Sequence, residues 1–499
     1  MLIRLCAVLL SAVPAVPAVP ARAVVSAAAI DAVVRAYRDG TRIPGVAVAV
    51  VRGREVVHTA GYGRTAEGEA VTDRTVLPVA SLSKSITALA VMQLVDAGRV
   101  RLDAPVRVHL PEFTMADGRA AAITVRQLLD QTSGMSDATY RSSGGPAPHT
   151  LREAVASMRG ARLAAAPGSR FEYHNPNYQV AARLVEVVSG QSFDGYLRRH
   201  VFQPAGMTDS RTIGTAAELP SGSRGHRMIA GLAVALPEPP AFGNGSGGVL
   251  STAHDLAAWL ITQNEQGRGP GGTPVVSPAA ITAMHRPPAR GSYGLGWTIG
   301  TTESGAPLID HTGGLVTSTA YQALLPAQGY GIAVMANAGS QYGDAPALGA
   351  RLIDLIGDRP MAAPPGSAPV IWFDIALLLA ALGAARLSIR GVRHATRWAR
   401  HRRPGSPATI ARLVPYLLPL VLLMTLHRVL SALYRGMDIS WIQAAYLYPA
   451  FTLLLVVASS GCAAVLGARL VRSVQAVAPV GADGVSVGER PPTGALTDD

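Results

Sequence analysis

The spacing of apolar and polar residues changes along the chain, and this change separates a mixed first part from an apolar last part. Between about residues 27 and 359, stretches with apolar residues every three or four positions alternate with β-branched stretches. The first spacing predicts amphipathic helices, and the second predicts half-buried or buried strands. The predicted helices cover 82–98, 125–131, 178–189 and 253–264. The predicted strands cover 45–51, 55–58, 320–325 and 331–336. We expect surface loops at 141–149, 215–243 and 265–276, which are rich in Gly, Pro and Ser.

The last part of the chain is apolar enough to cross a membrane three times. After a proline-rich linker over 360–369, the apolar stretches 370–387, 410–426 and 441–466 are each about long enough to span a bilayer. Seven arginines from Arg386 to Arg403, at the end of the first stretch and in the loop after it, indicate that this loop is cytoplasmic. The sequence therefore predicts a region of three transmembrane helices over 370–468 and a cytoplasmic tail over 469–499.

Residues 1–23 have the pattern of a secretory signal peptide. A short start with Arg4 is followed by an apolar stretch and by the small residues around Ala23. Three prolines interrupt the stretch, which argues against a membrane anchor. A signal peptide places the following domain, over 27–359, outside the cytoplasm. The arginine-rich loop indicates the same orientation independently.

The composition agrees with membrane segments and argues against several kinds of site. Hydrophobic residues make up 49% of the 499 residues and charged residues only 15%. The net charge is +12, but residues 361–499 hold 13 Arg against 6 acidic residues, a surplus of 7, which leaves 5 for the rest. A nucleic-acid-binding surface is therefore not indicated. Cys6 and Cys462 lie outside the globular part, and the histidines lack metal-ligand spacing, so we expect no disulfide framework, metal or other cofactor.

Lys84 is the only lysine of the chain, and it stands three positions after Ser81 in Ser81-Leu82-Ser83-Lys84. Arginine stays protonated at any workable pH, whereas a desolvated lysine can lose its proton. Because a helix is predicted here, the two side chains lie one turn apart, and Ser81 stands at the helix start. The free N–H groups and the dipole of a helix start favour negative charge. Ser81 is therefore a candidate nucleophile with Lys84 as its activator.

Two further motifs follow in order, Tyr173-His174-Asn175 and His311-Thr312-Gly313-Gly314. With them the chain resembles the superfamily of serine β-lactamases and penicillin-binding proteins, in the branch of class C β-lactamases, DD-carboxypeptidases and related esterases and D-aminopeptidases. This superfamily has Ser-x-x-Lys, Tyr-x-Asn, and Lys or His followed by Thr or Ser and Gly, in this order. Stretches such as Gln131-Thr132-Ser133-Gly134 and Tyr293-Gly294-Leu295-Gly296-Trp297 strengthen the resemblance, which covers roughly residues 27 to 358.

The resemblance implies an α/β fold of the α+β type, with an antiparallel sheet flanked by helices beside an all-helical lobe. Ser81 would lie between the two and attack a carbonyl group. Lys84 or Tyr173 would take the proton of the serine, and the sequence leaves open which of them is the base. The backbone N–H groups of Ser81 and Gly314 would form the oxyanion hole. Substrate binding is expected from Asn175, His311, Thr312 and Gly313.

His311 departs from the pattern of many relatives. Many β-lactamases and carboxypeptidases have a lysine at this position, whose fixed charge helps to bind a substrate carboxylate. An imidazole is largely neutral near pH 7, so recognition of an anionic C-terminus is less assured here. The histidine favours the esterase-like and D-aminopeptidase-like members of the superfamily.

Together these observations predict a membrane-anchored, extracytoplasmic serine hydrolase that forms an acyl-enzyme at Ser81. Its expected substrates are D-amino-acid peptides, β-lactams or related amides and esters. Its expected partners are a small-molecule or cell-wall peptide substrate and the lipid around the C-terminal helices, and the sequence leaves the oligomeric state open. The alternative is a membrane receptor that is acylated by penicillin or a wall fragment and barely turns over. The three membrane helices motivate this alternative, but the cytoplasmic side offers only a loop and a short tail.

Overall fold

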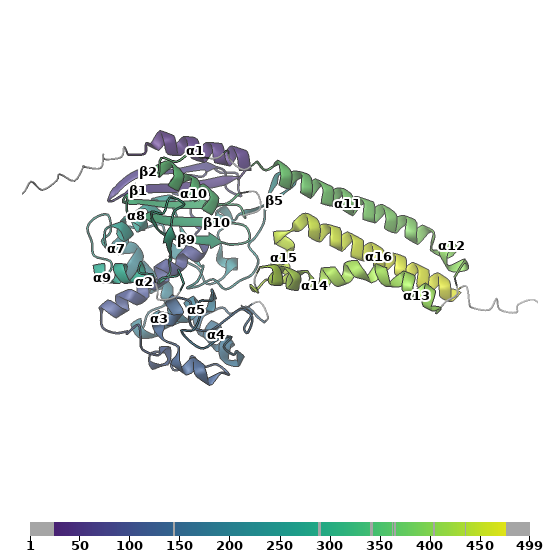
Figure 1. The fold of residues 1–499 in the computed structure, drawn as a ribbon, viewed down its shortest axis with the longest axis horizontal. Helices are drawn as coiled ribbons and strands as arrows, with labels where there is room; N and C mark the ends of the chain where they lie inside the picture. Colours follow the sequence, from purple (N-terminus) through teal and green to yellow (C-terminus); the bar gives the residue numbers. More distant parts are fainter. Residues whose placement is uncertain are drawn as a thin grey trace, which may run out of the picture.

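The computed structural model describes residues 24–142, 145–287, 291–339, 343–361, 363, 366–402, 405–434 and 436–475. The predicted signal peptide lies outside the described residues, and so does most of the predicted cytoplasmic tail. The described chain forms a rounded domain of sheet and helices, from which a long bundle of helices projects (Figure 1).

The centre of the domain is a six-stranded antiparallel sheet with the strand order β2-β1-β11-β10-β9-β8. Its strands are β1 Gly45–Arg52, β2 Glu55–Gly63, β8 Thr298–Thr301, β9 Pro307–Gly314, β10 Thr319–Leu325 and β11 Tyr330–Ala336. β1, β10 and β11 are apolar at nearly every position because helices cover both faces of the sheet. A smaller sheet has the order β3-β7-β4, with β3 Leu77–Pro78, β4 Arg211–Thr212 and β7 Val249–Ser251.

The side chains of β1 show how the two faces are filled. Val46, Val48 and Val50 pack with α1 (Ala27–Thr41) and α10 (Ala345–Ile356), which lie on the outer face. The intervening alanines and Val51 point to the opposite face and join the larger core around α2 (Ser83–Asp96) and α8 (Ala253–Asn264). This larger core continues into the helical lobe, so the sheet and the lobe share one interior.

The helical lobe is built around α2, α3 Val125–Leu129, α4 Leu151–Ser157 and α5 Pro176–Ser189. The remaining helices of the domain are short: α6 Phe193–Tyr196, α7 Gln203–Ala205, α9 Pro278–Met284, η1 Ala80–Leu82, η2 Val106–Val108, η3 Gly118–Ala122, η5 Met158–Gly160 and η6 Leu197–Phe202. The sheet, the covering helices and the separate lobe confirm the predicted fold class.

One predicted loop, 215–243, contains more structure than its composition indicates. It includes the short helices η7 Ala216–Glu218 and η8 Ser221–Ser223, and a hairpin of β5 His226–Ile229 and β6 Leu232–Ala235. Ala230 and Gly231 connect the two strands with φ of 50° and 84°, the positive pair that tight hairpin turns require. The glycines and prolines that suggested a loop therefore lie at turns between short elements.

The C-terminal bundle contains α11 Ala368–Arg393, α12 Ala395–Arg400, α13 Pro407–Leu413, η9 Val414–Leu417, α14 Leu418–Leu433, α15 Trp441–Leu447 and α16 Pro449–Gln475. Among the described residues, Ala368–Arg393, Pro407–Leu433 and Pro449–Gln475 are long and apolar enough to cross a membrane. α11 and α16 approach closely where both have small residues, since a Cβ at Gly391 would lie 2.7 Å from Val465 Cγ2.

The third of these helices begins later than the sequence predicted. The apolar stretch from Trp441 is divided by Tyr448, whose φ of −133° and ψ of 65° are not helical, and α16 starts anew at Pro449. Proline favours a helix start because its missing N–H group needs no partner there. Trp441–Leu447 is therefore a separate short helix at the end of the bundle nearest the domain (Figure 1).

Candidate active site

Ser81 lies in η1, directly before α2 and between the sheet and the helical lobe. The preceding residue, Ala80, has a φ of 47°, which is a strained conformation for a residue with a side chain. Ser83 stabilises this conformation, because its hydroxyl donates to the Ala80 carbonyl at 2.6 Å and accepts from the Val249 N–H at 3.0 Å. The smaller sheet thus holds the turn that presents Ser81.

Lys84 is fully buried behind Ser81. Its Nζ donates to Ser81 Oγ at 3.1 Å and to the backbone carbonyl of Ser246 at 2.7 Å. The same nitrogen lies 4.9 Å from the ring centre of Tyr173 and 5.8 Å from that of Tyr178. Burial lowers the pKa of Lys84 well below its usual value, since the site offers aromatic faces and one carbonyl but no counter-ion. Burial therefore makes the neutral amine easier to form than in water, and the nitrogen lies within hydrogen-bond distance of the serine oxygen.

The Tyr173 hydroxyl forms a hydrogen bond with Ser81 from the other side. Although 37% of this side chain is exposed, its phenol oxygen lies in the crowded cleft. Desolvation there raises the pKa of Tyr173 above its usual value, and the nearby Asp137 adds to the effect, while the bond to Ser81 opposes it. The phenol is therefore favoured over the phenolate in this structure.

His311 lies on β9 and is almost fully buried. Its Nδ1 lies 2.7 Å from the Thr312 carbonyl, which can only accept, so Nδ1 carries the proton. Nε2 then accepts from the Tyr293 hydroxyl at 2.8 Å. Desolvation lowers the pKa of His311 to about 3, and Lys84 contributes to this shift. The imidazole is thus neutral, and it supplies no positive charge to the cleft.

The other residues expected to bind substrate lie along the same cleft. Asn175 and Thr312 have exposed side chains, Asn175 at the start of α5 and Thr312 on β9. In the described chain, β8 pairs with β9 only as far as Asp310. The part of β9 from His311 to Gly314 lies beyond this pairing and borders the cleft.

Gly313 brings β9 against the turn that presents Ser81. A Cβ at Gly313 would lie 2.6 Å from the Val79 carbonyl oxygen and 3.0 Å from Leu82 Cδ1, whereas one at Gly314 would meet nothing within 4 Å. The absence of a side chain at Gly313 therefore sets the distance between the backbone of Gly314 and that of Ser81.

Residues 30–355 of the chain match the Beta-lactamase family. The chain belongs to the β-lactamase family. This result confirms the predicted superfamily of β-lactamases and penicillin-binding proteins. The family match ends before the C-terminal bundle, which begins at Ala368.

Curated relatives and solved structures agree with this assignment. Protein flp of Staphylococcus aureus (strain COL) is 28% identical over 318 residues, which make up 63% of this chain and 63% of flp. Penicillin-binding protein 4 of Amycolatopsis lactamdurans is 31% identical over 323 residues, covering 61% of this chain and 83% of the relative. The octameric penicillin-binding protein homologue from Pyrococcus abyssi aligns with a TM-score of 0.57 at 26% identity, covering 66% of this chain and 77% of its own.

The D-stereospecific amidohydrolase from Streptomyces sp. has the same fold, with a TM-score of 0.52 at 22% identity over 62% of this chain and 94% of its own.

No role was predicted from the sequence for Tyr293 or Ser246 of this β-lactamase-family protein. The Tyr293 hydroxyl bonds His311 and also contacts Tyr178 and Gln131. Ser246 acts through its carbonyl oxygen, which a sequence motif cannot reveal. Both residues occur in glycine-rich stretches, and these stretches were the only feature of the sequence that could have pointed to their roles. Gly296, for example, has a φ of 83°, and a Cβ there would lie 2.8 Å from the Lys84 carbonyl.

A buried pair holds the Tyr173 segment. His174 Nδ1 lies 2.6 Å from a carboxylate oxygen of Asp137, and the His174 N–H donates to Gln131 Oε1 at 3.1 Å. Gln131 Oε1 also accepts from Asn177 Nδ2 at 2.6 Å. The residue between Tyr173 and Asn175 thus anchors the motif to the helical lobe, while its two neighbours stay at the cleft.

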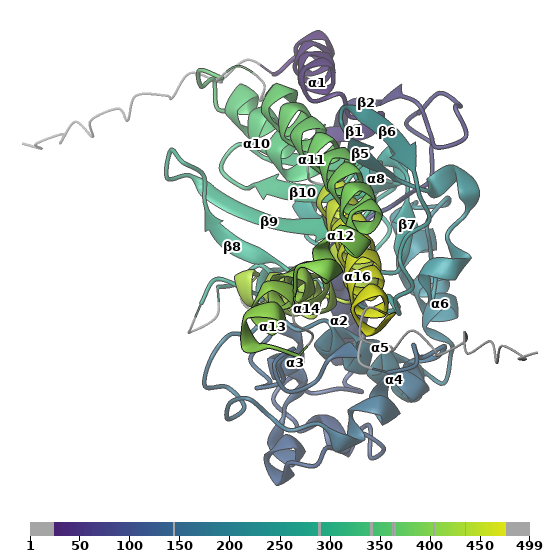
Figure 2. The same ribbon diagram turned by 90° about the vertical axis from the view of Figure 1, so that its right-hand side faces the viewer.

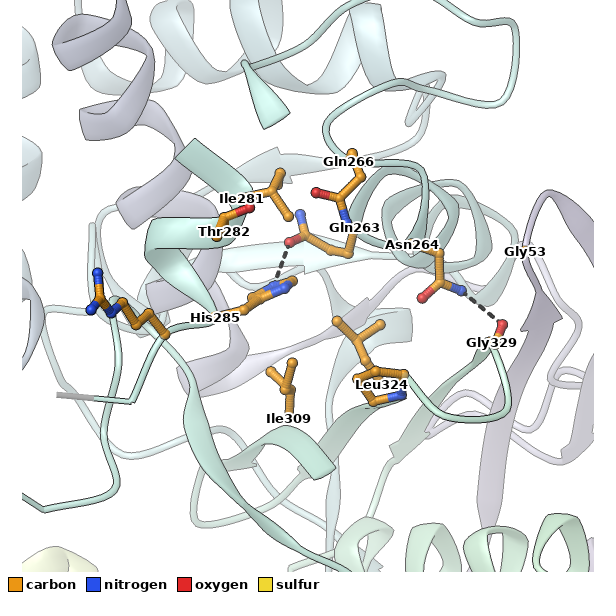
Figure 3. Close-up of a pocket in the computed structure, with 12 residues that line it drawn as sticks. Gly53, Gln263, Asn264, Gln266, Ile281, Thr282, His285, Ile309, Leu324 and Gly329 are labelled. Carbon is orange, nitrogen blue, oxygen red and sulfur yellow. Dashed lines mark hydrogen bonds between the residues drawn. The ribbon is translucent and has the colours of Figure 1, made fainter. Parts of the chain in front are cut away.

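A separate cavity of about 650 Å³ lies at the end of α8, next to α9 and β10 (Figure 3). His285 Nε2 lies 3.1 Å from Gln263 Oε1, and Asn264 bonds the Gly329 carbonyl. Burial lowers the pKa of His285 to about 4, so it is neutral. The residues that line this cavity include no serine, cysteine or lysine, so acyl transfer is assigned to the Ser81 cleft. Among the described residues, no group of three or more His, Cys, Asp or Glu side chains is placed to hold a metal ion.

Proposed function

We propose that the protein is a membrane-anchored, extracytoplasmic serine hydrolase that forms an acyl-enzyme at Ser81. The observation that carries this proposal is the 3.1 Å contact between Ser81 Oγ and the buried amine of Lys84, whose lowered pKa favours the neutral base. Membership of a family whose members are typically hydrolases supports it.

Acylation begins with the attack of Ser81 Oγ on a carbonyl carbon of the substrate. Lys84 takes the serine proton, because its nitrogen lies 3.1 Å from Ser81 Oγ and, once the amine is neutral, its lone pair can accept from the hydroxyl. The carbonyl oxygen becomes an oxyanion, which the N–H groups of Ser81 and Gly314 stabilise. This assigns the base to Lys84, which the sequence had left open between Lys84 and Tyr173.

Tyr173 passes the proton to the leaving group. Its raised pKa keeps it protonated, so its hydroxyl can donate to the departing nitrogen or oxygen, and the proton that Lys84 took from Ser81 then restores the phenol. The acyl-enzyme that remains is attacked by water, and the same two groups remove the proton of that water. The cycle thus needs no cofactor.

The neutral His311 bears on the substrate class. A substrate with a free carboxylate gains no fixed positive charge from it, so neutral amides and esters are favoured over peptides that end in a carboxylate. The resemblance to Penicillin-binding protein 4 keeps β-lactams among the candidates. D-amino-acid peptides remain the broader expectation from the family.

The orientation in the membrane follows from charge. The end of the bundle far from the domain carries Arg390, Arg393, Arg397 and Arg400 on α11 and α12. By the positive-inside rule this end is cytoplasmic, and the catalytic domain is extracytoplasmic. The three long apolar helices then act as the anchor.

A turnover assay tests the proposed function. The purified full-length protein is incubated with nitrocefin, a D-alanyl-D-alanine peptide, a D-amino-acid amide and p-nitrophenyl acetate. We expect multiple turnovers on at least one substrate, loss of turnover in Ser81→Ala, and wild-type rates in the control Ser304→Ala, whose serine lies in an exposed turn. Stoichiometric labelling by penicillin without turnover would support the receptor instead. Full activity in Ser81→Ala would refute both functions.

A further inference from the structure

The membrane bundle contacts the domain beside the catalytic cleft. The Asp438 N–H donates to Asp137 at 2.8 Å, and Asp137 in turn holds His174 beside Tyr173. Arg141 NH2 reaches Ser431 Oγ at 3.3 Å. The segment between α14 and α16 is thus bonded to the wall of the cleft that carries the Tyr-x-Asn motif.

The opposite wall is bonded to the same segment. Arg227 on β5 is buried, and its guanidinium donates to the Val316 carbonyl at 2.9 Å and to the Leu447 carbonyl at 2.9 Å. Glu238 accepts from the N–H groups of Val316 and Thr317 at 2.7 and 2.9 Å. Val316 and Thr317 lie two and three residues after the end of β9 at Gly314. The bundle therefore projects from the face where the sheet and the helical lobe meet (Figure 2).

Aromatic residues mark the outer membrane surface at this contact. Trp372 lies in the first turns of α11, Trp441 and Tyr446 lie on α15, and Tyr434 and Tyr448 flank α15 with their hydroxyls 2.7 Å apart. Tryptophan and tyrosine concentrate at the level of the lipid headgroups. The contacts between the bundle and the cleft therefore lie at the level of the lipid headgroups of the outer leaflet.

The hairpin of β5 and β6 lies at this level too. Its tip touches α11, since the Ala230 N–H donates to Asp374 at 2.9 Å and a Cβ at Gly231 would lie 3.0 Å from Ile371 Cδ1. Leu232 on the same hairpin is 70% exposed. An exposed leucine beside a membrane helix is a residue that lipid can cover.

Two adjoining cavities lead from this level to residues that neighbour the reacting groups. We call them together the acyl channel. The outer one, about 410 Å³, is lined mainly by apolar residues and reaches Tyr446 of α15. The inner one, about 50 Å³, reaches Pro78, Gly247 and Leu315. Both are lined by Thr215, Ala216, Leu219, Glu238 and Ala241.

The inner end of the acyl channel lies beside the catalytic groups. Leu315 directly follows Gly314, and Gly247 follows Ser246, whose carbonyl accepts from Lys84. A Cβ at Gly247 would lie 3.8 Å from the backbone of Ala80, next to Ser81. A wide apolar outer cavity with a narrow inner one fits a linear alkyl chain better than a peptide, whose amide groups would lose their hydrogen bonds with water there.

We propose that the acyl channel binds the linear acyl chain of a lipid ester or amide that enters from the outer leaflet. This proposal rests on the proposed function of Ser81 and adds its substrate class. Ser81 Oγ forms a bond to the acyl carbon, the bond from that carbon to the lipid oxygen or nitrogen breaks, and the leaving group takes the proton that Ser81 loses. Water then releases the fatty acid from Ser81.

Chain-length dependence tests the proposal. Full-length protein in phospholipid nanodiscs is assayed with the p-nitrophenyl esters of acetate, butyrate and octanoate. Burial of one methylene group contributes about a fourfold gain in kcat/KM, so octanoate should exceed butyrate, which is four methylenes shorter, by on the order of 100-fold. Equal rates for the three esters, or a decline with chain length, would overturn the proposal.

Variants that fill the acyl channel show whether the preference for longer acyl chains arises there. Ala216→Trp and Ala241→Trp place an indole where both cavities meet, and Ala121→Trp, on the exposed η3 of the helical lobe, is the matched control. We expect the ratio of kcat/KM on octanoate to that on acetate to fall toward one in the channel variants and to stay at the wild-type value in the control. A preference for octanoate that survives in both channel variants would contradict the proposal.

Different results would overturn the acyl channel and the proposed function. If the wild type cleaves acetate, nitrocefin or a D-amino-acid amide without a preference for longer chains, the acyl channel is wrong and the proposed function stands. If Ser81→Ala cleaves all substrates like the wild type, the proposed function itself fails.

Discussion

The substitution Gly313→Ala adds a methyl group between β9 and the turn that presents Ser81, and the structure gives the distance by which the two must separate. The new Cβ would lie 2.6 Å from the Val79 carbonyl oxygen, and ordinary contacts begin at 3.4 Å, so β9 and the Ser81 turn must separate by about 0.8 Å. The added methyl group would meet Val79, Leu82 and Ala320, so the substitution adds no atom to the substrate site. Its effect on catalysis must therefore pass through the position of Gly314.

Two magnitudes follow from this separation. Overpacking of this kind costs about 1–3 kcal/mol of folding stability. Loss of one oxyanion donor lowers kcat by about 10²- to 10³-fold, so a displaced donor should lower kcat/KM by roughly tenfold to a hundredfold. The stability loss leaves most molecules folded, while the activity loss is large.

The assay compares kcat/KM on nitrocefin or p-nitrophenyl acetate with the melting temperature of each protein. Gly300→Ala is the control, because it lies on β8 of the same sheet and a Cβ there would meet nothing within 4 Å. We expect wild-type activity in Gly300→Ala and the stated loss in Gly313→Ala. A folded Gly313→Ala protein with wild-type kcat/KM would refute the idea that this contact positions the oxyanion donor.

Three further predictions concern the charges of the cleft. Because burial lowers the pKa of Lys84 from its usual 10.5, the rise of kcat/KM with pH that reports its deprotonation should occur well below that value, and a rise only near 10.5 would contradict the assigned base. The unfolded chain keeps Lys84 protonated up to about 10.5, whereas the folded site releases the proton earlier. The wild type should therefore gain stability with pH across that window, by up to about 1.4 kcal/mol per unit, relative to Lys84→Met. Melting temperatures of both proteins at several pH values check this difference, and a constant difference would argue against a desolvated amine. Tyr293→Phe removes the hydroxyl that bonds His311 at 2.8 Å and leaves a buried acceptor without its donor, so we expect a loss of about 1–3 kcal/mol in urea unfolding. An unchanged unfolding midpoint would show that water replaces the hydroxyl.

The parts of the fold and site that depend on local spacing could be predicted from the sequence. The spacing of Ser81 and Lys84 needs only one turn of helix, and the strands around 320–336 need only an apolar run with a turn. The order of the three motifs indicated the family, and with it the arrangement of sheet and lobe.

The parts that depend on packing between distant segments could not be predicted. The neutrality of His311 results from its burial and from the Tyr293 hydroxyl, and neither can be read from the motif itself. The role of Gly313 depends on the position of the Val79 carbonyl between β3 and η1, far away in the sequence. The contact of Asp438 with Asp137 joins residues 301 positions apart. Such contacts are made by the tertiary structure, so a single sequence carries little signal for them.

We propose that Ser81 becomes acylated because the buried Lys84 acts as its base. The most direct test is the rate of acylation at Ser81, followed by intact-protein and peptide mass spectrometry after mixing with benzylpenicillin or a p-nitrophenyl ester. We predict one acyl group per molecule on the peptide that contains Ser81, and no such adduct in Ser81→Ala. Acylation should be at least about 100-fold slower in Lys84→Arg, because its guanidinium cannot accept the proton. An adduct on another residue, or wild-type acylation in Lys84→Arg, would contradict it.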